Sequence, residues 1–125
     1  MSTAVALRNF VVAPVLEEFA FRGCLIALLH SAGWSFSSIV WLSPVMFGVA
    51  HVHHAWSNIA GGMAVAEAAT RSAFQFAYTW LFGVITAYTF ARTGNLYGCI
   101  AQHVFCNLMG FPSFAWRNPQ HPLAK

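Results

Sequence analysis

Three long stretches of this 125-residue chain carry no charged side chain, and they limit the folds that are open to it. They cover residues 23–66, 72–91 and 93–116, and each reaches the roughly 20 residues that a helix needs to cross a bilayer. Only 7% of the residues are charged and 58% are hydrophobic, whereas soluble domains carry about 25% charged residues. Because this leaves too little polar surface for a water-soluble monomer, we predict an all-α, polytopic membrane helical bundle.

Prolines, glycines and charged residues divide the chain into about four predicted helices. Since a proline removes a backbone donor, we expect kinks at Pro14 and Pro44. The segment 61–71, with two glycines and two charged residues, is expected to form a loop, and the segment 93–95 a turn. The helices are predicted at residues 4–30, 36–55, 72–92 and 96–109.

No internal repeat, low-complexity block or linker divides the chain. We therefore expect a helical membrane core at residues 1–116 and a polar tail at 117–125. No secretory signal is recognised at the start. The six Lys and Arg residues are spread along the chain, so no nucleic-acid partner is expected. The three cysteines are expected to pack inside helices rather than to form disulfides; they are Cys24, Cys99 and Cys106.

Two of the three acidic residues are adjacent, at Glu17 and Glu18, inside an apolar run. An ionised carboxylate there would face a desolvation cost of several kcal/mol. Arg22 follows Glu18 by four residues, so the two share a helix face and can pair. Glu17 lies about 100° further round the helix, which leaves it free for a different role.

Three further polar residues inside predicted helices are candidates for the same site. His51 is in the second helix, and His103 and Asn107 are four residues apart in the fourth. Taken singly, a membrane histidine or asparagine can simply bond one helix to another. Together with the acids, they supply a base, a second proton carrier and hydrogen-bond donors, which water-mediated cleavage of an amide requires.

The chain resembles the CAAX prenyl endopeptidase superfamily, which comprises the type 2 CAAX proteases and related bacterial membrane proteases. The resemblance covers about residues 14–112 and includes three motifs in the same order: EExxxR at residues 17–22, FxxxH at 47–51 and HxxxN at 103–107. Flanking segments are similar to the eukaryotic, Ras-converting branch in particular, at residues 47–54, 92–96 and 103–112.

This resemblance implies an endopeptidase of the endoplasmic reticulum membrane, with several membrane crossings, that removes the last three residues after an isoprenylated cysteine. Its partners would be prenylated CaaX proteins such as small GTPases, together with membrane lipid. No cofactor and no metal is implied. The superfamily embeds these helices in a larger bundle of about eight, and the chain has room for about half of them.

The resemblance also implies roles for the matched residues of the first motif. Glu17 would be the general base that activates water. Glu18 and Arg22 would form a supporting ion pair. The sequence leaves open which of the two adjacent acids is the base.

The other two motifs would supply the remaining catalytic residues. His51 would help to hold the water and move its proton. His103 and Asn107 would stabilise the oxyanion.

Four alternatives compete with this interpretation. One is a bacterial-type membrane protease of the same superfamily. Another is a histidine-rich metalloenzyme that uses Glu17, His51, His54 and His103, although the zinc-protease pattern HExxH is absent. A third is a thiolate nucleophile at Cys106, which an apolar setting suppresses. The last is an inactive helical scaffold.

Overall fold

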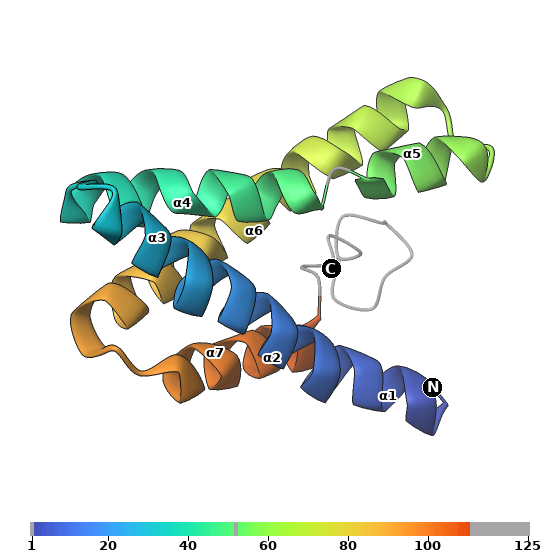
Figure 1. The fold of residues 1–125 in the computed structure, drawn as a ribbon. Coiled ribbons are helices and arrows are strands. Elements are labelled where there is room, and N and C mark those ends of the chain that lie inside the picture. Colours follow the sequence, from blue (N-terminus) through green and yellow to red (C-terminus); the bar gives the residue numbers. More distant parts are fainter. Residues whose placement is uncertain (1, 52, 111–125) are drawn as a thin grey trace, which may run out of the picture.

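The computed structural model of the chain describes residues 2–51 and 53–110, and every regular element in them is helical (Figure 1). The all-α prediction is therefore confirmed for this part of the chain. In order, the elements are α1 (Thr3–Leu7), η1 (Arg8–Val12), α2 (Ala13–Glu18), η2 (Phe19–Leu25), α3 (Ile26–Ser31), α4 (Phe36–Ala50), α5 (His53–Ala60), α6 (Val65–Thr93) and α7 (Leu96–Met109). The predicted tail at residues 117–125 lies outside the described residues.

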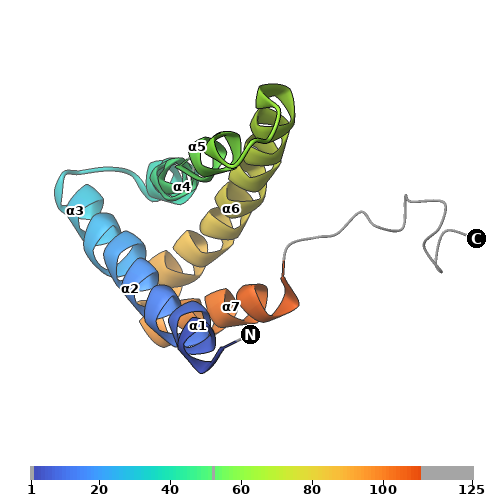
Figure 2. The same ribbon diagram turned by 90° about the vertical axis from the view of Figure 1, so that its right-hand side faces the viewer.

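The first five elements form one continuous rod, from α1 to α3 (Figures 1 and 2). The prediction of a helix with an interruption near Pro14 is confirmed, and the interruption is the π-helical segment η1. At its end the Ala13 N–H bonds to the carbonyl of Arg8, five residues back. In this register the Asn9 carbonyl would pair with residue 14, but proline has no N–H to donate. The rod therefore leaves one backbone acceptor for another helix.

The second helix was predicted at 36–55, and its predicted end is wrong. α4 stops at Ala50 and a separate helix, α5, runs from His53 to Ala60. Two imidazoles bond to backbone carbonyls at this break: His51 Nδ1 lies 2.8 Å from the Phe47 oxygen and His53 Nδ1 lies 2.7 Å from the Ala50 oxygen. Polar side chains that take up backbone acceptors in this way compete with helix continuation. Pro44 is accommodated inside α4.

The third helix begins seven residues earlier than predicted, because residues 65–71 are helical rather than a loop. Glu67 and Arg71 form an ion pair one turn apart, with 3.0 Å between the carboxylate and the guanidinium. This spacing supports a helix, so the two charges mark the first turns of α6.

The fourth helix runs over residues 96–109, as predicted. Gly94 ends α6 with a φ of 63°, in the left-handed region that glycine adopts at little cost. Asn95 then caps α7, since its side-chain oxygen accepts from the Gly98 N–H at 3.1 Å.

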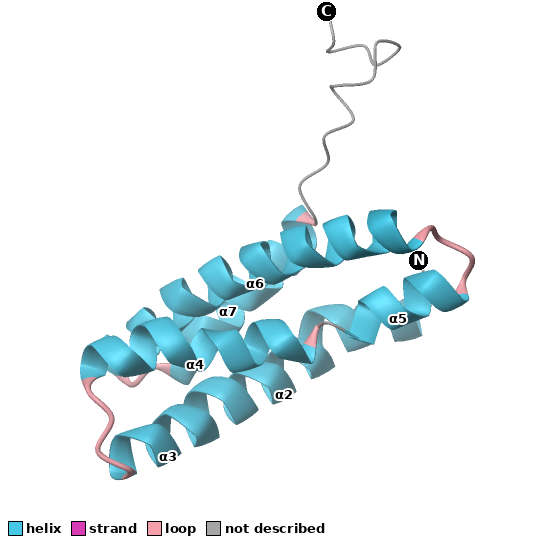
Figure 3. Cartoon of the chain, turned by 90° about the horizontal axis from the view of Figure 1, so that it is seen from above, coloured by secondary structure: helices cyan, strands magenta, loops and turns pink. Residues whose placement is uncertain are grey.

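α4 and α6 run antiparallel and lie side by side (Figures 1 and 3). The two helices approach each other closely at positions where one of them has a glycine. A Cβ added at Gly83 would lie 2.7 Å from the Pro44 Cβ, and one added at Gly48 would lie 2.8 Å from the Phe76 ring. α7 packs against both α2 and α6, so the rod, the α4–α6 pair and α7 surround a common interior (Figure 2).

In the part of the chain that the structure describes, only α4 and α5 taken together, Phe36–Ala60, are long and apolar enough to cross a membrane by length and composition. They lie within the first of the three charge-free stretches. In the other two stretches, α7 has 14 residues, and the 29-residue α6 carries polar side chains along its length.

We predict that Gly83→Ala destabilises the protein, because the new methyl group would overlap Pro44. Overpacking of this kind typically costs about 1–3 kcal/mol, and the midpoint of thermal unfolding in detergent should fall. Gly98→Ala is the matched control, since its nearest atom is 3.8 Å away and alanine favours a helix over glycine by about 0.5–1 kcal/mol. Equal melting behaviour of the two variants would contradict the close α4–α6 contact.

Candidate active site

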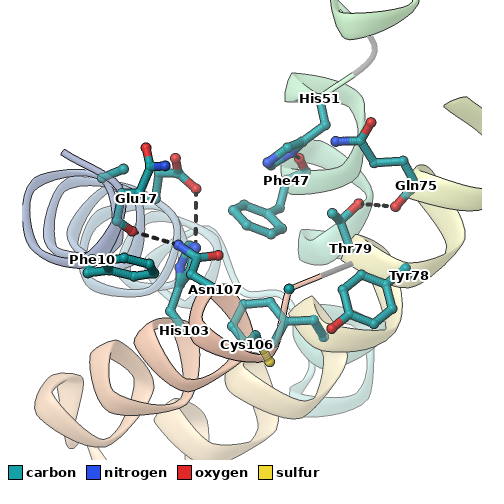
Figure 4. Close-up of a pocket in the computed structure, with 14 residues that line it drawn as sticks. Phe10, Glu17, Phe47, His51, Gln75, Tyr78, Thr79, His103, Cys106 and Asn107 are labelled. Carbon is teal, nitrogen blue, oxygen red and sulfur yellow. Dashed lines mark hydrogen bonds and ion pairs between the residues drawn. The ribbon is translucent and has the colours of Figure 1, made fainter. Parts of the chain in front are cut away.

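A cavity of about 490 Å³ lies between the rod, α4, α6 and α7 (Figure 4). Its lining includes all four residues that the sequence proposed as catalytic: Glu17, His51, His103 and Asn107. These residues come from α2, from α7 and from the end of α4, and they lie up to 90 positions apart in the sequence. The fold thus brings the three motifs onto one cavity.

The two adjacent acids occupy different environments. Glu18 is completely buried, and its Oε2 lies 3.1 Å from Nε of Arg22, itself only 2% exposed. The ion pair predicted from their spacing is therefore confirmed. Glu17 keeps 34% of its side chain exposed and lines the cavity. One acid is held inside the protein and the other can meet a ligand.

His103 connects these two acids. Its Nδ1 lies 2.7 Å from Glu18 Oε1, and its Nε2 lies 3.8 Å from Glu17 Oε2. Since an ionised carboxylate can only accept, Nδ1 carries the proton in the bond to Glu18. Nε2 therefore faces Glu17. The distance between them is longer than a direct hydrogen bond, and a water molecule can bridge the two atoms.

Arg22 is enclosed by groups from α4 and α6. Its Nη2 donates to the hydroxyl of Thr86, and its Cζ lies 4.5 Å from the centre of the Phe47 ring and 5.7 Å from that of Phe82. Such stacking on aromatic faces is favourable for a desolvated guanidinium. The charge of Arg22 is thus matched by Glu18 and sealed from water by two rings.

His51 faces the cavity from the side opposite Glu17 (Figure 4). Its bond to the Phe47 carbonyl uses Nδ1, which leaves Nε2 free for a ligand. Among the described residues, no hydrogen bond or ion pair joins it to Glu17 or His103. The Phe47 ring lies between the imidazoles, with its centre 4.9 Å from that of His51 and 6.1 Å from that of His103.

Asn107 bonds α7 to the first helix. Its Nδ2 donates to the Asn9 carbonyl at 2.8 Å, the acceptor that Pro14 leaves without a partner. The interhelical role considered for this residue therefore exists in the structure. A side-chain amide carries two N–H groups, so one remains for a ligand in the cavity.

Sequence reasoning missed the wall that α6 contributes. No motif marks this helix, and its polar residues look like those of any packed membrane helix. A threonine there commonly bonds to the carbonyl four residues back, as Thr79 and Thr86 do, so it gives no distinct signal. The lining residues from α6 are Gln75, Tyr78, Thr79 and Phe82.

The other candidate groups have weaker connections to the cavity. Cys106 lines it and is half-buried, whereas Cys99 is buried elsewhere, and all three cysteines are free. His54 is exposed and is absent from the described lining. Over residues 2–51 and 53–110, no group of three or more His, Cys, Asp or Glu side chains is arranged to hold a metal ion.

Comparison with known families matches residues 1–109 to the family described as "Type II CAAX prenyl endopeptidase Rce1-like". The chain belongs to this family. The resemblance inferred from the three motifs is thereby confirmed. No solved structure gives a significant match.

Curated relatives of this Rce1-like chain come from several eukaryotes. It is 39% identical over 114 residues to the probable CAAX prenyl protease 2 of Schizosaccharomyces pombe, covering 90% of this chain and 42% of the relative. It is 42% identical over 117 residues to CAAX prenyl protease 2 of Homo sapiens, covering 91% of this chain and 35% of the relative. The chain therefore spans less than half the length of these relatives.

We predict that the two adjacent acids of the Rce1-like site differ in their effect on stability. Glu18→Gln leaves the Arg22 charge buried without its partner, and breaking a buried pair typically costs about 3–5 kcal/mol. Glu17→Gln, its matched control at the next position, removes a carboxylate that reaches the cavity and should change stability little. Thermal unfolding of both variants in detergent provides the comparison. A melting midpoint for Glu18→Gln equal to that of Glu17→Gln would contradict the buried-pair assignment.

Proposed function

We propose that the chain is the catalytic core of an intramembrane endopeptidase that removes the aaX tripeptide from isoprenylated CaaX proteins, small GTPases among them. Membership of the family supports this, as do the names of two relatives, the probable CAAX prenyl protease 2 of Schizosaccharomyces pombe and the CAAX prenyl protease 2 of Homo sapiens. The observation that carries the proposal is that Glu17, His51, His103 and Asn107 line one cavity. This core would correspond to residues 1–116.

In the proposed mechanism Glu17 is the general base. It is the acid that reaches the cavity, whereas Glu18 is fully buried and engaged with Arg22 and His103. Glu17 would take a proton from a water molecule, whose oxygen then attacks the carbonyl carbon of the prenylated cysteine. The proton passes to the leaving amine as the C–N bond breaks, which yields a new carboxyl group and the free tripeptide.

Donors on α7 would stabilise the oxyanion of the tetrahedral intermediate. Asn107 would use the amide N–H that does not bond to Asn9. His103 would also stabilise the oxyanion, with its Nδ1 held by the Glu18 carboxylate and its Nε2 facing the cavity. His51 would hold the water and move its proton from the opposite side of the cavity.

We place this core in the endoplasmic reticulum membrane as a multi-pass protein. Large apolar side chains are exposed along the rod, including Leu16 at 60%, Phe19 at 56% and Leu28 at 67%. Large apolar side chains exposed along a helix are expected to contact lipid or further helices. A farnesyl or geranylgeranyl chain dissolved in the bilayer would then reach the protein from the lipid side.

We predict that the chain, reconstituted in lipid vesicles, releases the tripeptide from a farnesylated CaaX peptide. Glu17→Gln should lower the rate by about 10²- to 10⁴-fold, the usual contribution of a general base. Glu67→Gln is the matched control, because Glu67 is an exposed acid in a surface ion pair. Tripeptide is quantified by mass spectrometry.

A chimera extends this test to the helices of the longer relatives. Residues 1–109 would replace the matching segment of CAAX prenyl protease 2 of Saccharomyces cerevisiae, to which the chain is 38% identical over 113 residues. Cleavage by the chimera, but not by the chimera with Glu17→Gln, supports the proposed function. A folded chimera and a folded chain that both release no tripeptide would refute it.

We further predict that chelation leaves the cleavage rate unchanged, because the proposed roles use only carboxylate, imidazole and amide groups. Purified protein is treated with EDTA, assayed, and analysed for zinc and iron. Stoichiometric metal together with a loss of cleavage on chelation, restored by adding the metal back, would favour the metalloenzyme alternative instead.

A further inference from the structure

We propose that Thr86 of α6 is a positioning residue, which acts through Arg22 and Glu18 to fix the tautomer and orientation of His103. The inference rests on the proposed function for its catalytic meaning. None of the three sequence motifs includes Thr86, and α6 otherwise supplies only the wall of the cavity. The four side chains come from the rod, from α6 and from α7.

The hydroxyl of Thr86 is oriented as an acceptor for Arg22. Its own proton has two backbone acceptors on α6, the carbonyls of Phe82 at 3.1 Å and Gly83 at 3.2 Å. A hydroxyl has one donor and two acceptor lone pairs, so its oxygen is left to accept from Arg22 Nη2. Since Thr86 is completely buried, water has no access to replace this acceptor.

The Arg22 guanidinium is therefore held from two sides. Nε faces Glu18 on the rod and Nη2 faces Thr86 on α6. Neither Nη1 of Arg22 nor Oε2 of Glu18 has a hydrogen-bond partner within the described residues, so Nε and Oε2 form an ion pair, while the directional bond of the group is the one from Nη2 to Thr86, with the Phe47 ring beneath. Without the Thr86 oxygen, the planar guanidinium loses the partner that opposes its rotation about the Cδ–Nε bond.

Glu18 transmits this constraint to the cavity. Its Oε2 faces Arg22 while its Oε1 accepts from His103 Nδ1 at 2.7 Å. A carboxylate held in this way keeps the proton of His103 on Nδ1 and directs Nε2 to Glu17. His103 is only 7% exposed, so bulk water does not compete for Nδ1. The chain of contacts from Thr86 through Arg22 and Glu18 thus ends at Nε2 of His103, the atom that faces the reacting groups.

The test compares three substitutions on α6. Thr86→Val keeps the branched shape and removes the acceptor, whereas Thr86→Ser keeps the acceptor. Thr70→Val is the matched control, because Thr70 makes the same type of backbone bond on α6, to Ala66 at 2.9 Å, but is exposed. Cleavage of a farnesylated CaaX peptide in vesicles gives kcat and KM for each.

We expect Thr86→Val to lower kcat by about 10- to 100-fold, the range seen when an outer hydrogen-bond partner of an active-site group is lost. KM should stay within about twofold, since Thr86 does not line the cavity. Thr86→Ser should restore most of kcat and Thr70→Val should match the wild type. An unchanged kcat in Thr86→Val, a rise in KM alone, or no rescue by serine would overturn the proposal.

A spectroscopic measurement makes the test independent of activity. In protein labelled with ¹⁵N-histidine, the His103 signals are identified by their loss in His103→Gln. We expect one tautomer, protonated at Nδ1, in the wild type and in Thr86→Ser, and a mixture in Thr86→Val. A single unchanged tautomer in Thr86→Val would overturn the inference.

If the valine variant does not fold, Thr86→Cys provides a second test, because a thiol is a weaker acceptor than a hydroxyl. This variant should show an intermediate mixture of tautomers, and the wild-type pattern there would overturn the inference.

The two proposals fail in different ways. A wild-type protein that releases no tripeptide, alone or as the chimera, refutes the proposed function while the tautomer comparison still decides the role of Thr86. Cleavage by the wild type with no effect of Thr86→Val refutes only the positioning role.

Discussion

The buried ion pair between Glu18 and Arg22 holds the site together. Removing two charges from water costs several kcal/mol per ion, and attraction repays this only with good geometry and further polar partners. Here those partners come from other helices: Thr86 from α6, His103 from α7, and the ring of Phe47 from α4. The charges can stay buried only when these helices are correctly packed. The pair therefore couples the position of the catalytic groups to the fold itself.

Irregular backbone supplies the rest of the geometry. The π segment before Pro14 leaves the Asn9 carbonyl without a backbone donor, and Asn107 takes it, which fixes the end of α7 on the rod. The break after α4 puts His51 at a helix end, where its ring bonds back to the Phe47 carbonyl. In both places a departure from the α-helix leaves a backbone carbonyl without its usual N–H partner. A polar side chain that lines the cavity bonds to that carbonyl. Such departures are common at functional sites.

Predictions from local patterns succeeded where the physics is local. The turn at 93–95 and the helix at 96–109 follow from a glycine that adopts positive φ and an asparagine that caps the next helix. The predicted start of the third helix was wrong because Glu67 and Arg71 were interpreted as charges of a loop. Their spacing also suits an ion pair on a helix. The predicted end of the second helix was wrong because a histidine side chain can either project from a continuing helix or bond to a backbone carbonyl of that helix. The sequence does not show which of the two occurs.

The sequence by itself determined the helical class and the pairing of Glu18 with Arg22, which follow from composition and from a spacing of four residues, about one helical turn. The set of four residues proposed for catalysis came from the resemblance of the three motifs to a known family. Only the tertiary structure decided that Glu17 rather than Glu18 reaches the cavity, that α6 forms a wall, and that Thr86 completes the surroundings of Arg22. Those outcomes depend on how separate helices face one another, and the residues of a single helix carry no record of that.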